Sequence, residues 1–99
     1  MDRQAALDRL RPRESELRAM GVTALSLFGS VARDEAGPES DVDLAVTLDR
    51  SRPMGLFALG GIYEHLRELL GVDRIDVATE PSEKPRFQLE IDRDRVHVF

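Results

Sequence analysis

Two segments of the sequence decide the fold: Leu27-Phe28-Gly29-Ser30-Val31-Ala32-Arg33, and Ser40-Asp41-Val42-Asp43-Leu44-Ala45-Val46. An apolar run ends abruptly at Gly29-Ser30, a polar stretch punctuated by Gly37-Pro38 follows, and a second apolar run then begins. Short apolar runs bounded by turn residues are typical of buried strands. The pattern therefore predicts one strand over residues 22–28 and another over residues 42–48.

The second strand carries two carboxylates, Asp41 and Asp43, two positions apart. Alternate residues of a strand point to the same face, so these two side chains project together while Val42 and Leu44 point into the core. Two neighbouring carboxylates repel each other, and a divalent cation between them would relieve the repulsion. Hard oxygen ligands of this kind suit Mg²⁺. A D-x-D pair by itself also fits the solvated face of an edge strand.

The turn after the first strand adds a second feature to the same region. Glycine at position 29 permits a ligand to approach the backbone closely. The backbone N–H groups that follow Gly29, together with the Ser30 hydroxyl, are suited to cradling phosphate. A phosphate cradle beside a carboxylate pair indicates a site for the phosphates of a nucleotide.

The order Gly29-Ser30-x-x-Arg33, then Ser40-Asp41-x-Asp43-Leu44, resembles the signature of the minimal nucleotidyltransferases, small members of the DNA polymerase beta superfamily. The resemblance extends from about residue 10 to about residue 91. It implies a single-domain α+β (α/β) nucleotidyltransferase fold over residues 1–99, a small mixed β-sheet with helices packed on one face. Asp34 departs from the pattern, because small members often carry glycine there, and it makes the loop more acidic near the phosphates.

A third carboxylate completes the pattern that the resemblance implies. In these enzymes it lies on a strand beside the D-x-D strand, and Asp76, within Ile75-Asp76-Val77, matches it. Asp73 is the competing candidate, but it shares a face with the apolar Ile75 and Val77. Taken alone, Asp76 also fits an ordinary exposed strand carboxylate.

The resemblance implies the following roles. Catalysis and Mg²⁺ binding would fall to Asp41, Asp43 and Asp76, and phosphate binding to Gly29, Ser30 and Arg33. Asp76 would either accept the proton of the attacking hydroxyl or serve only as a metal ligand. Arg33 fits an ion pair with a loop carboxylate equally well.

The remaining elements follow from helical spacing and from residues that end helices. We expect a helix over residues 2–10, a break near Arg11 because Pro12 does not fit a helix interior, and a second helix over residues 13–20. A short helix is expected from residue 30 to about 35, a third strand over residues 72–79 and a terminal strand over residues 96–98. The segment from Pro81-Ser82 alternates like a strand around Phe87, and we interpret it as a helix.

A longer helix is expected from Pro53 to residue 70, because proline fits the first turn of a helix. Its apolar residues recur at helical spacing and predict an inward stripe of Leu56, Leu59, Tyr63, Leu66 and Leu70. Gly60-Gly61 interrupts this stripe, and each glycine costs about 1 kcal/mol relative to alanine in a helix interior. Either the helix bends at this pair or it packs very closely on the sheet.

Composition excludes several classes of function. The chain has 99 residues and a net charge of −5, which argues against binding long nucleic acid through a basic surface. It has no cysteine, so it has neither disulfides nor thiol chemistry. No apolar run approaches the length of a membrane span, and we expect a cytoplasmic protein without a membrane partner.

The resemblance also implies a reaction and a partner. A minimal nucleotidyltransferase of this kind uses ATP and Mg²⁺ to move AMP onto a hydroxyl, with release of pyrophosphate. Small members are commonly the antitoxin beside a HEPN-type ribonuclease toxin, and the acceptor there is a tyrosine of the toxin. Two alternatives stay open at this point: an antitoxin that neutralises its partner by binding alone, and a nucleotidyltransferase subunit that acts on another acceptor. The sequence indicates a nucleotide site and leaves the acceptor open.

Overall fold

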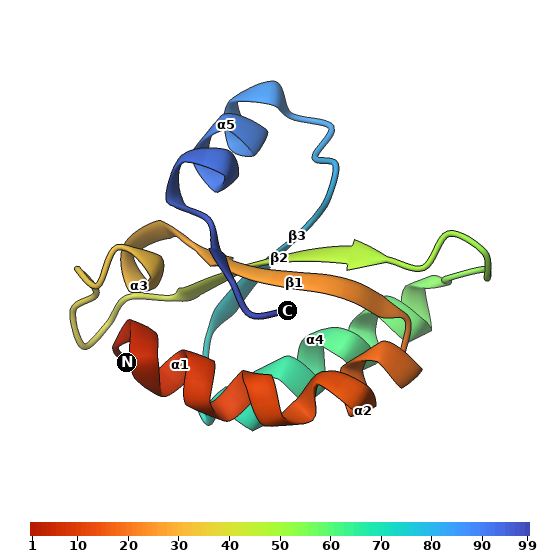
Figure 1. Cartoon of the computed structure of the whole chain (residues 1–99), viewed down its shortest axis with the longest axis horizontal. Coiled ribbons are helices and arrows are strands. Elements are labelled where there is room, and N and C mark those ends of the chain that lie inside the picture. The colour runs from red at the N-terminus through yellow and green to blue at the C-terminus, as the bar shows by residue number, and fades with distance from the viewer.

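The protein, described over residues 1–99 by a computed structural model, is built around a sheet of four strands (Figure 1). The elements occur in the order α1 (Arg3–Leu10), the 3-10 turn η1 (Arg11–Arg13), α2 (Glu14–Ala19), β1 (Val22–Phe28), α3 (Gly29–Ala32), β2 (Val42–Leu48), α4 (Leu56–Leu70), β3 (Ile75–Thr79), α5 (Pro85–Asp94) and β4 (Val96–His97). None of the helices has the length and apolar character that crossing a membrane requires.

The sheet is mixed, with strand order β3-β2-β1-β4. β1 pairs antiparallel with both β2 and β4, whereas β2 and β3 are parallel. Parallel neighbours need a crossover connection, and α4 supplies it. The register places Phe28 opposite Asp43, and Asp43 opposite Asp76. Three strands therefore contribute neighbouring residues at one end of the sheet.

One face of the sheet is the main hydrophobic core. Leu27 and Leu44 point to this face, and they pack with buried residues from α1, α2 and α4, such as Leu10, Leu17 and Leu66. The strand alternation that the sequence predicted therefore holds, because Val42 and Leu44 are buried while Asp43 lies on the other side.

The opposite face is covered in part by α5, which lies across the sheet from α1, α2 and α4 (Figure 1). Ile91 of α5 is fully buried against Phe28 and Ala45, with Ala78 packed beside them. The α+β class and the mixed sheet are confirmed. The expectation that the helices lie on one face holds for α1, α2 and α4 and is wrong for α5, because Phe28 and Ala45 offer an apolar patch on the second face.

Several boundaries differ from those predicted. β1 and β2 have the predicted bounds, but β3 begins at Ile75, because α4 ends at Gly71 in the left-handed conformation and a loop precedes the ladder. Helix α4 begins at Leu56, after Gly55, and α5 begins at Pro85. The short helix after β1 covers only Gly29–Ala32.

The inward stripe of α4 is shifted from the predicted one. Ile62, Leu66 and Leu70 are buried, whereas Leu56 is 84% exposed and Phe57 is 97% exposed. The helix is continuous through Gly60 and Gly61, and a Cβ at either position would meet nothing within 4 Å. Close packing on the sheet is therefore not the reason for this glycine pair, and nothing in the structure explains it.

Candidate active site

Parallel pairing of β2 and β3 brings two of the predicted site residues together. Asp43 and Asp76 are directly opposite in the register and lie on the face away from the main core. Asp43 is half-buried, and Asp76 is exposed. The resemblance implies that Asp76 lies on a strand beside the D-x-D strand, and the structure places Asp43 and Asp76 side by side at the start of the two strands.

Burial and like charges dominate the electrostatics of this carboxylate pair. The pKa of Asp43 is raised from 3.8 to about 6, first by burial and then by repulsion from, and hydrogen bonding with, the neighbouring Asp76. Asp41 and Glu90 act in the same direction. A carboxyl group whose charge is disfavoured by burial and by other carboxylates marks a position where a bound cation would be favourable.

Gly29 joins the turn after β1 to this pair. Its φ is +74°, a conformation that side-chain-bearing residues rarely adopt, and a Cβ at this position would overlap the Oδ2 atom of Asp43. The glycine is therefore required by backbone conformation and by the carboxylate packed against it. Ser30, the next residue, is half-buried at the start of α3. The turn and the carboxylate pair form one continuous site.

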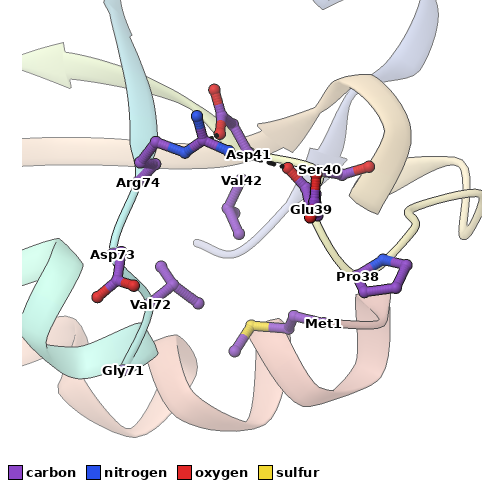
Figure 2. Close-up of a pocket in the computed structure, with 10 residues that line it drawn as sticks. All are labelled: Met1, Pro38, Glu39, Ser40, Asp41, Val42, Gly71, Val72, Asp73 and Arg74. Carbon is purple, nitrogen blue, oxygen red and sulfur yellow. Dashed lines mark hydrogen bonds and ion pairs between the residues drawn. The ribbon is translucent and has the colours of Figure 1, made fainter.

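The third predicted carboxylate, Asp41, has a partner of opposite charge. The Nε atom of Arg74 lies 3.3 Å from Asp41 Oδ1, and Nη2 of the same arginine donates to the carbonyl oxygen of Glu39 (Figure 2). Both groups border a cavity of about 470 Å³ between the end of the 37–41 loop and the 71–74 loop. Nowhere in the structure do three or more His, Cys, Asp or Glu side chains form a group that could hold an ion.

The structure therefore assembles two of the three carboxylates closely and holds the third on an arginine. Asp43 in β2 faces a like charge in Asp76 of β3, whereas Asp41 and Arg74, which lie just before these two strands begin, form an ion pair. Arg74 was not identified from the sequence, although its position two residues before Asp76 was the available signal. Asp73, the competitor of Asp76, lies outside β3 and lines the cavity beside Asp41.

Arg33 makes ion pairs within the protein. Its Nη1 lies 2.6 Å from Oδ2 of Asp94 in α5, and its Nε lies 3.1 Å from Oε2 of Glu35. Asp94 is 9% exposed, and hydrogen bonds from Arg93 and Arg33 lower its pKa despite burial. The pair compensates a buried charge and connects α3 to α5. The ion-pair alternative for Arg33 is what the structure contains, and phosphate binding by Arg33 stays a prediction.

Asp94 and Glu90 were also missed in the sequence. Both belong to a charged helix, where most side chains face solvent, so residue type gave no signal. Glu90 lies one residue before the buried Ile91 and Asp94 lies three residues after it, and this spacing was the only indication available. The contact between Arg33 and Asp94 joins residues 61 positions apart.

A four-stranded mixed sheet, a Gly-Ser turn after the first strand and facing carboxylates on the next two strands define a nucleotidyltransferase. The chain belongs to the family described as "Nucleotidyltransferase domain", whose family model matches residues 7–97. It therefore belongs to a class of enzymes that transfer nucleotidyl groups, and such enzymes typically use ATP or another nucleotide with a divalent metal ion.

Among the relatives, the protein adenylyltransferase MntA of Thermococcus cleftensis is 33% identical over 90 residues, covering 90% of this chain and 88% of that protein. A provisionally named protein adenylyltransferase of Methanocaldococcus jannaschii, MJ1379, is 32% identical over 78 residues, covering 78% of this chain and 77% of that protein. The chain is a nucleotidyltransferase similar to protein adenylyltransferases of the MntA type.

Solved structures agree in fold. A protein provisionally described as a minimal nucleotidyltransferase superposes with a TM-score of 0.69 at 33% identity, covering 97% of this chain and 95% of that one. A chain from a toxin–antitoxin complex crystallised with AMP-PNP gives a TM-score of 0.70 at 18% identity, covering 91% of this chain and 73% of that one. The second likeness concerns the fold alone.

Proposed function

We propose that this protein transfers AMP from ATP to a hydroxyl group of a partner protein, with release of pyrophosphate, and that the acceptor is a tyrosine of a HEPN-type toxin. The observation that carries the proposal is the facing pair Asp43 and Asp76 beside the Gly29 turn. The similarity to a protein adenylyltransferase of the MntA type and the fold shared with a toxin–antitoxin complex support the choice of acceptor class.

The residues present fit a divalent cation. The donors are hard carboxylate oxygens, and Asp43 is held in a position where burial and Asp76 disfavour its charge unless a cation is near. Asp43 and Asp76 would hold Mg²⁺, and Asp41 would join them on release from Arg74. When bound, Mg²⁺ would neutralise the triphosphate and stabilise the charge of the attacking and leaving oxygens.

The chain's own groups then account for the rest of the reaction. The Ser30 hydroxyl and the backbone N–H groups of the Gly29-Ser30 turn hold the β- and γ-phosphates. The acceptor oxygen forms a bond to the α-phosphorus, and the bond from this phosphorus to the oxygen that bridges to the β-phosphate breaks. Pyrophosphate leaves with that electron pair. Asp76, which is exposed, takes the hydroxyl proton and passes it to solvent.

A second function has its own observation in favour. Asp41 is held by Arg74, and the chain contains no preformed group of three ligands. These features, with the acidic Asp34 in the loop, suit an antitoxin that neutralises its partner by binding without nucleotide chemistry. The intact Gly29-Ser30 turn and the Asp43–Asp76 pair would then have no function, which is why we favour the enzyme.

The experiment mixes the purified protein with ATP, Mg²⁺ and the protein encoded beside its gene, and measures the intact mass of that partner. The expected result is an added AMP, located on a tyrosine by peptide mapping and absent when Mg²⁺ is chelated. A stable complex without added mass would select the binding module. Transfer to a different hydroxyl would retain the enzyme and reject the acceptor.

A further inference from the structure

The start of α4 presents an apolar surface that no other part of the chain covers. Phe57 is 97% exposed and Leu56, next to it, is 84% exposed. Met54, just before the helix, is half-buried. Single exposed apolar residues are ordinary on protein surfaces, but large apolar side chains that lie together mark a site of interaction.

Two exposed glycines adjoin this surface. Gly60 and Gly61 follow Leu56 and Phe57 by four residues, so they lie beside them one turn further along the helix. A Cβ at either glycine would meet nothing within 4 Å, so no contact within the chain requires glycine there. Glycine weakens a helix relative to alanine. In return, the pair leaves a stretch of helix surface without side chains, which the backbone of another molecule can approach closely.

This helix surface is complementary to itself in shape. The buried stripe of α4 consists of Ile62, Leu66 and Leu70, and helical spacing puts Phe57 and Gly61 on the opposite side. A contact between two copies across a two-fold axis needs one surface that carries both a projection and the hollow that receives it. In an antiparallel pair of α4 helices, the Phe57 ring of each copy lies over the glycine pair of the other.

The charges on either side of the surface also complement each other. Arg50 lies seven residues before Phe57, and Glu68 lies seven residues after Gly61. Both are exposed, and neither takes part in an ion pair within the chain. Antiparallel pairing brings Arg50 of each copy towards Glu68 of the other, whereas parallel pairing would bring like charges together. A second copy of the chain therefore matches this surface in shape and in charge.

The surface is remote from the candidate active site. Strand β2 begins beside Asp43, ends at Leu48 and leads into α4, so the start of α4 lies at the end of the sheet away from α3 (Figure 1). Helix α4 also packs on the core face of the sheet, opposite the face that carries Asp43 and Asp76. Pairing through α4 leaves the active site open, so it does not depend on the proposed function.

The size of the surface sets the strength of the association. One phenylalanine ring removes about 150–250 Å² from water when it is buried, and two copies contribute two such rings with a leucine beside each. The total falls near the lower end for specific protein interfaces, about 1,000 Å². A contact of this size gives a reversible dimer with a Kd in the micromolar range.

We infer that two copies of this chain pair antiparallel through the start of α4, with Phe57 of each copy packed on Gly60 and Gly61 of the other. The dimer presents two active sites that face away from the contact. A helix of the partner protein is the competing occupant of the surface, and the test separates the two.

The experiment follows the sedimentation velocity of the full chain from about 1 µM to about 1 mM. The parent should change from monomer to dimer over this range. Phe57→Ser should weaken dimerisation at least about tenfold and leave the fold intact, because the side chain touches little else. Leu89→Ser is the matched control, since Leu89 is 71% exposed on α5 and should dimerise like the parent.

Two further substitutions separate the contact from a loss of stability. Gly61→Gln should raise the melting temperature of the dilute monomer, because glutamine favours a helix and the space around the position is open. The same substitution should abolish the dimer, because it fills the hollow. Arg50→Glu and Glu68→Lys should each weaken the dimer, and the double variant should restore it if the two residues meet across the axis.

A parent that stays monomeric over the whole range would overturn the inference, and so would a dimer that Phe57→Ser and Gly61→Gln leave unchanged. Transfer of AMP to the partner should be the same for Phe57→Ser and the parent. If Phe57→Ser instead removes binding or transfer to the partner, the surface belongs to the partner and the second copy is the wrong occupant. A dimer without any AMP transfer would retain this inference and reject the proposed function.

Discussion

The two faces of one sheet perform different tasks in this protein. Towards α1, α2 and α4, the strands present Leu27, Leu44 and similar residues to a dry core. Towards α5, the same strands present Asp43 and Asp76 beside a small apolar patch around Ile91. Side chains alternate at every residue, so a single strand supplies stability on one side and chemistry on the other. Substitutions on the two faces should therefore separate folding from activity.

The largest effect is expected from Asp43→Asn. The change keeps the shape of the side chain and removes a charge that would hold Mg²⁺, so AMP transfer should fall at least about a thousandfold. Stability in chelator should stay the same or rise slightly, because the repulsion between Asp43 and Asp76 is relieved. Thermal melting and a transfer assay with the partner and saturating Mg²⁺ measure both.

The same variant tests the binding alternative. Full neutralisation of the partner in cells by a folded protein that transfers no AMP would show that binding alone is the function. A marked loss of stability would instead indicate that Asp43 is a structural carboxylate.

Leu66→Ala is the counterpart on the core face. Leu66 is fully buried, and truncation of such a residue costs about 2–5 kcal/mol of unfolding free energy. Activity per folded molecule should be unchanged at low temperature. Urea unfolding, followed by the transfer assay on the folded fraction, checks the separation. An equal loss of activity in the folded fraction would mean that the two faces are coupled.

Gly29→Ala should lower both the stability of the protein and its AMP transfer, each by less than the two substitutions above. A residue with a side chain at this positive φ costs about 1–2 kcal/mol, and its Cβ would displace the Asp43 carboxylate. We expect AMP transfer to fall about 10- to 100-fold, by misplacement of Asp43. Gly37→Ala is the control, since a Cβ there meets only Ser40 Oγ at 3.9 Å. Equal behaviour of the two variants would remove Gly29 from the site.

Arg74→Gln tests how the charges near Asp43 and Asp76 control the binding of a cation. Arg74 competes with a cation for Asp41, so its removal should raise the affinity for Mn²⁺, measured by electron paramagnetic resonance, by several-fold. Stability should change by less than about 1 kcal/mol, because the Arg74 side chain is 69% exposed and such surface pairs contribute little. Weaker Mn²⁺ binding would show that Arg74 helps to position Asp41 and does not compete for it.

The smallest effect concerns pH. Folding raises the pKa of Asp43 from 3.8 to about 6, so the folded state binds this proton more tightly than the unfolded state does. Its contribution to stability is complete below about pH 4 and is lost as pH rises through 6. In chelator, the melting temperature of the parent relative to Asp43→Asn should therefore be higher at pH 5 than at pH 7. If the difference in melting temperature between the two proteins is the same at pH 5 and pH 7, the raised pKa of Asp43 is contradicted.

Local signals in the sequence account for the first two strands, the turn between them and the candidate residues. The strands over residues 22–28 and 42–48 follow from apolar runs bounded by turn residues, which are local signals. The sequence also indicates the need for glycine at position 29, but it points to close approach of a ligand as the reason. In the structure, the nearest atom to a Cβ there belongs to Asp43.

Which of these residues come into contact depends on the packing of elements that are distant in sequence. Asp43 reaches Asp76 through a parallel register, Arg33 reaches Asp94 across 61 positions, and Arg74 rather than a carboxylate lies against Asp41. Strand alternation fixes the face on which a side chain lies, but the partner depends on how sequence-distant elements pack. For the same reason, helix α5 could be predicted from its residues, whereas its position over the face of the sheet that carries Asp43 and Asp76 could not.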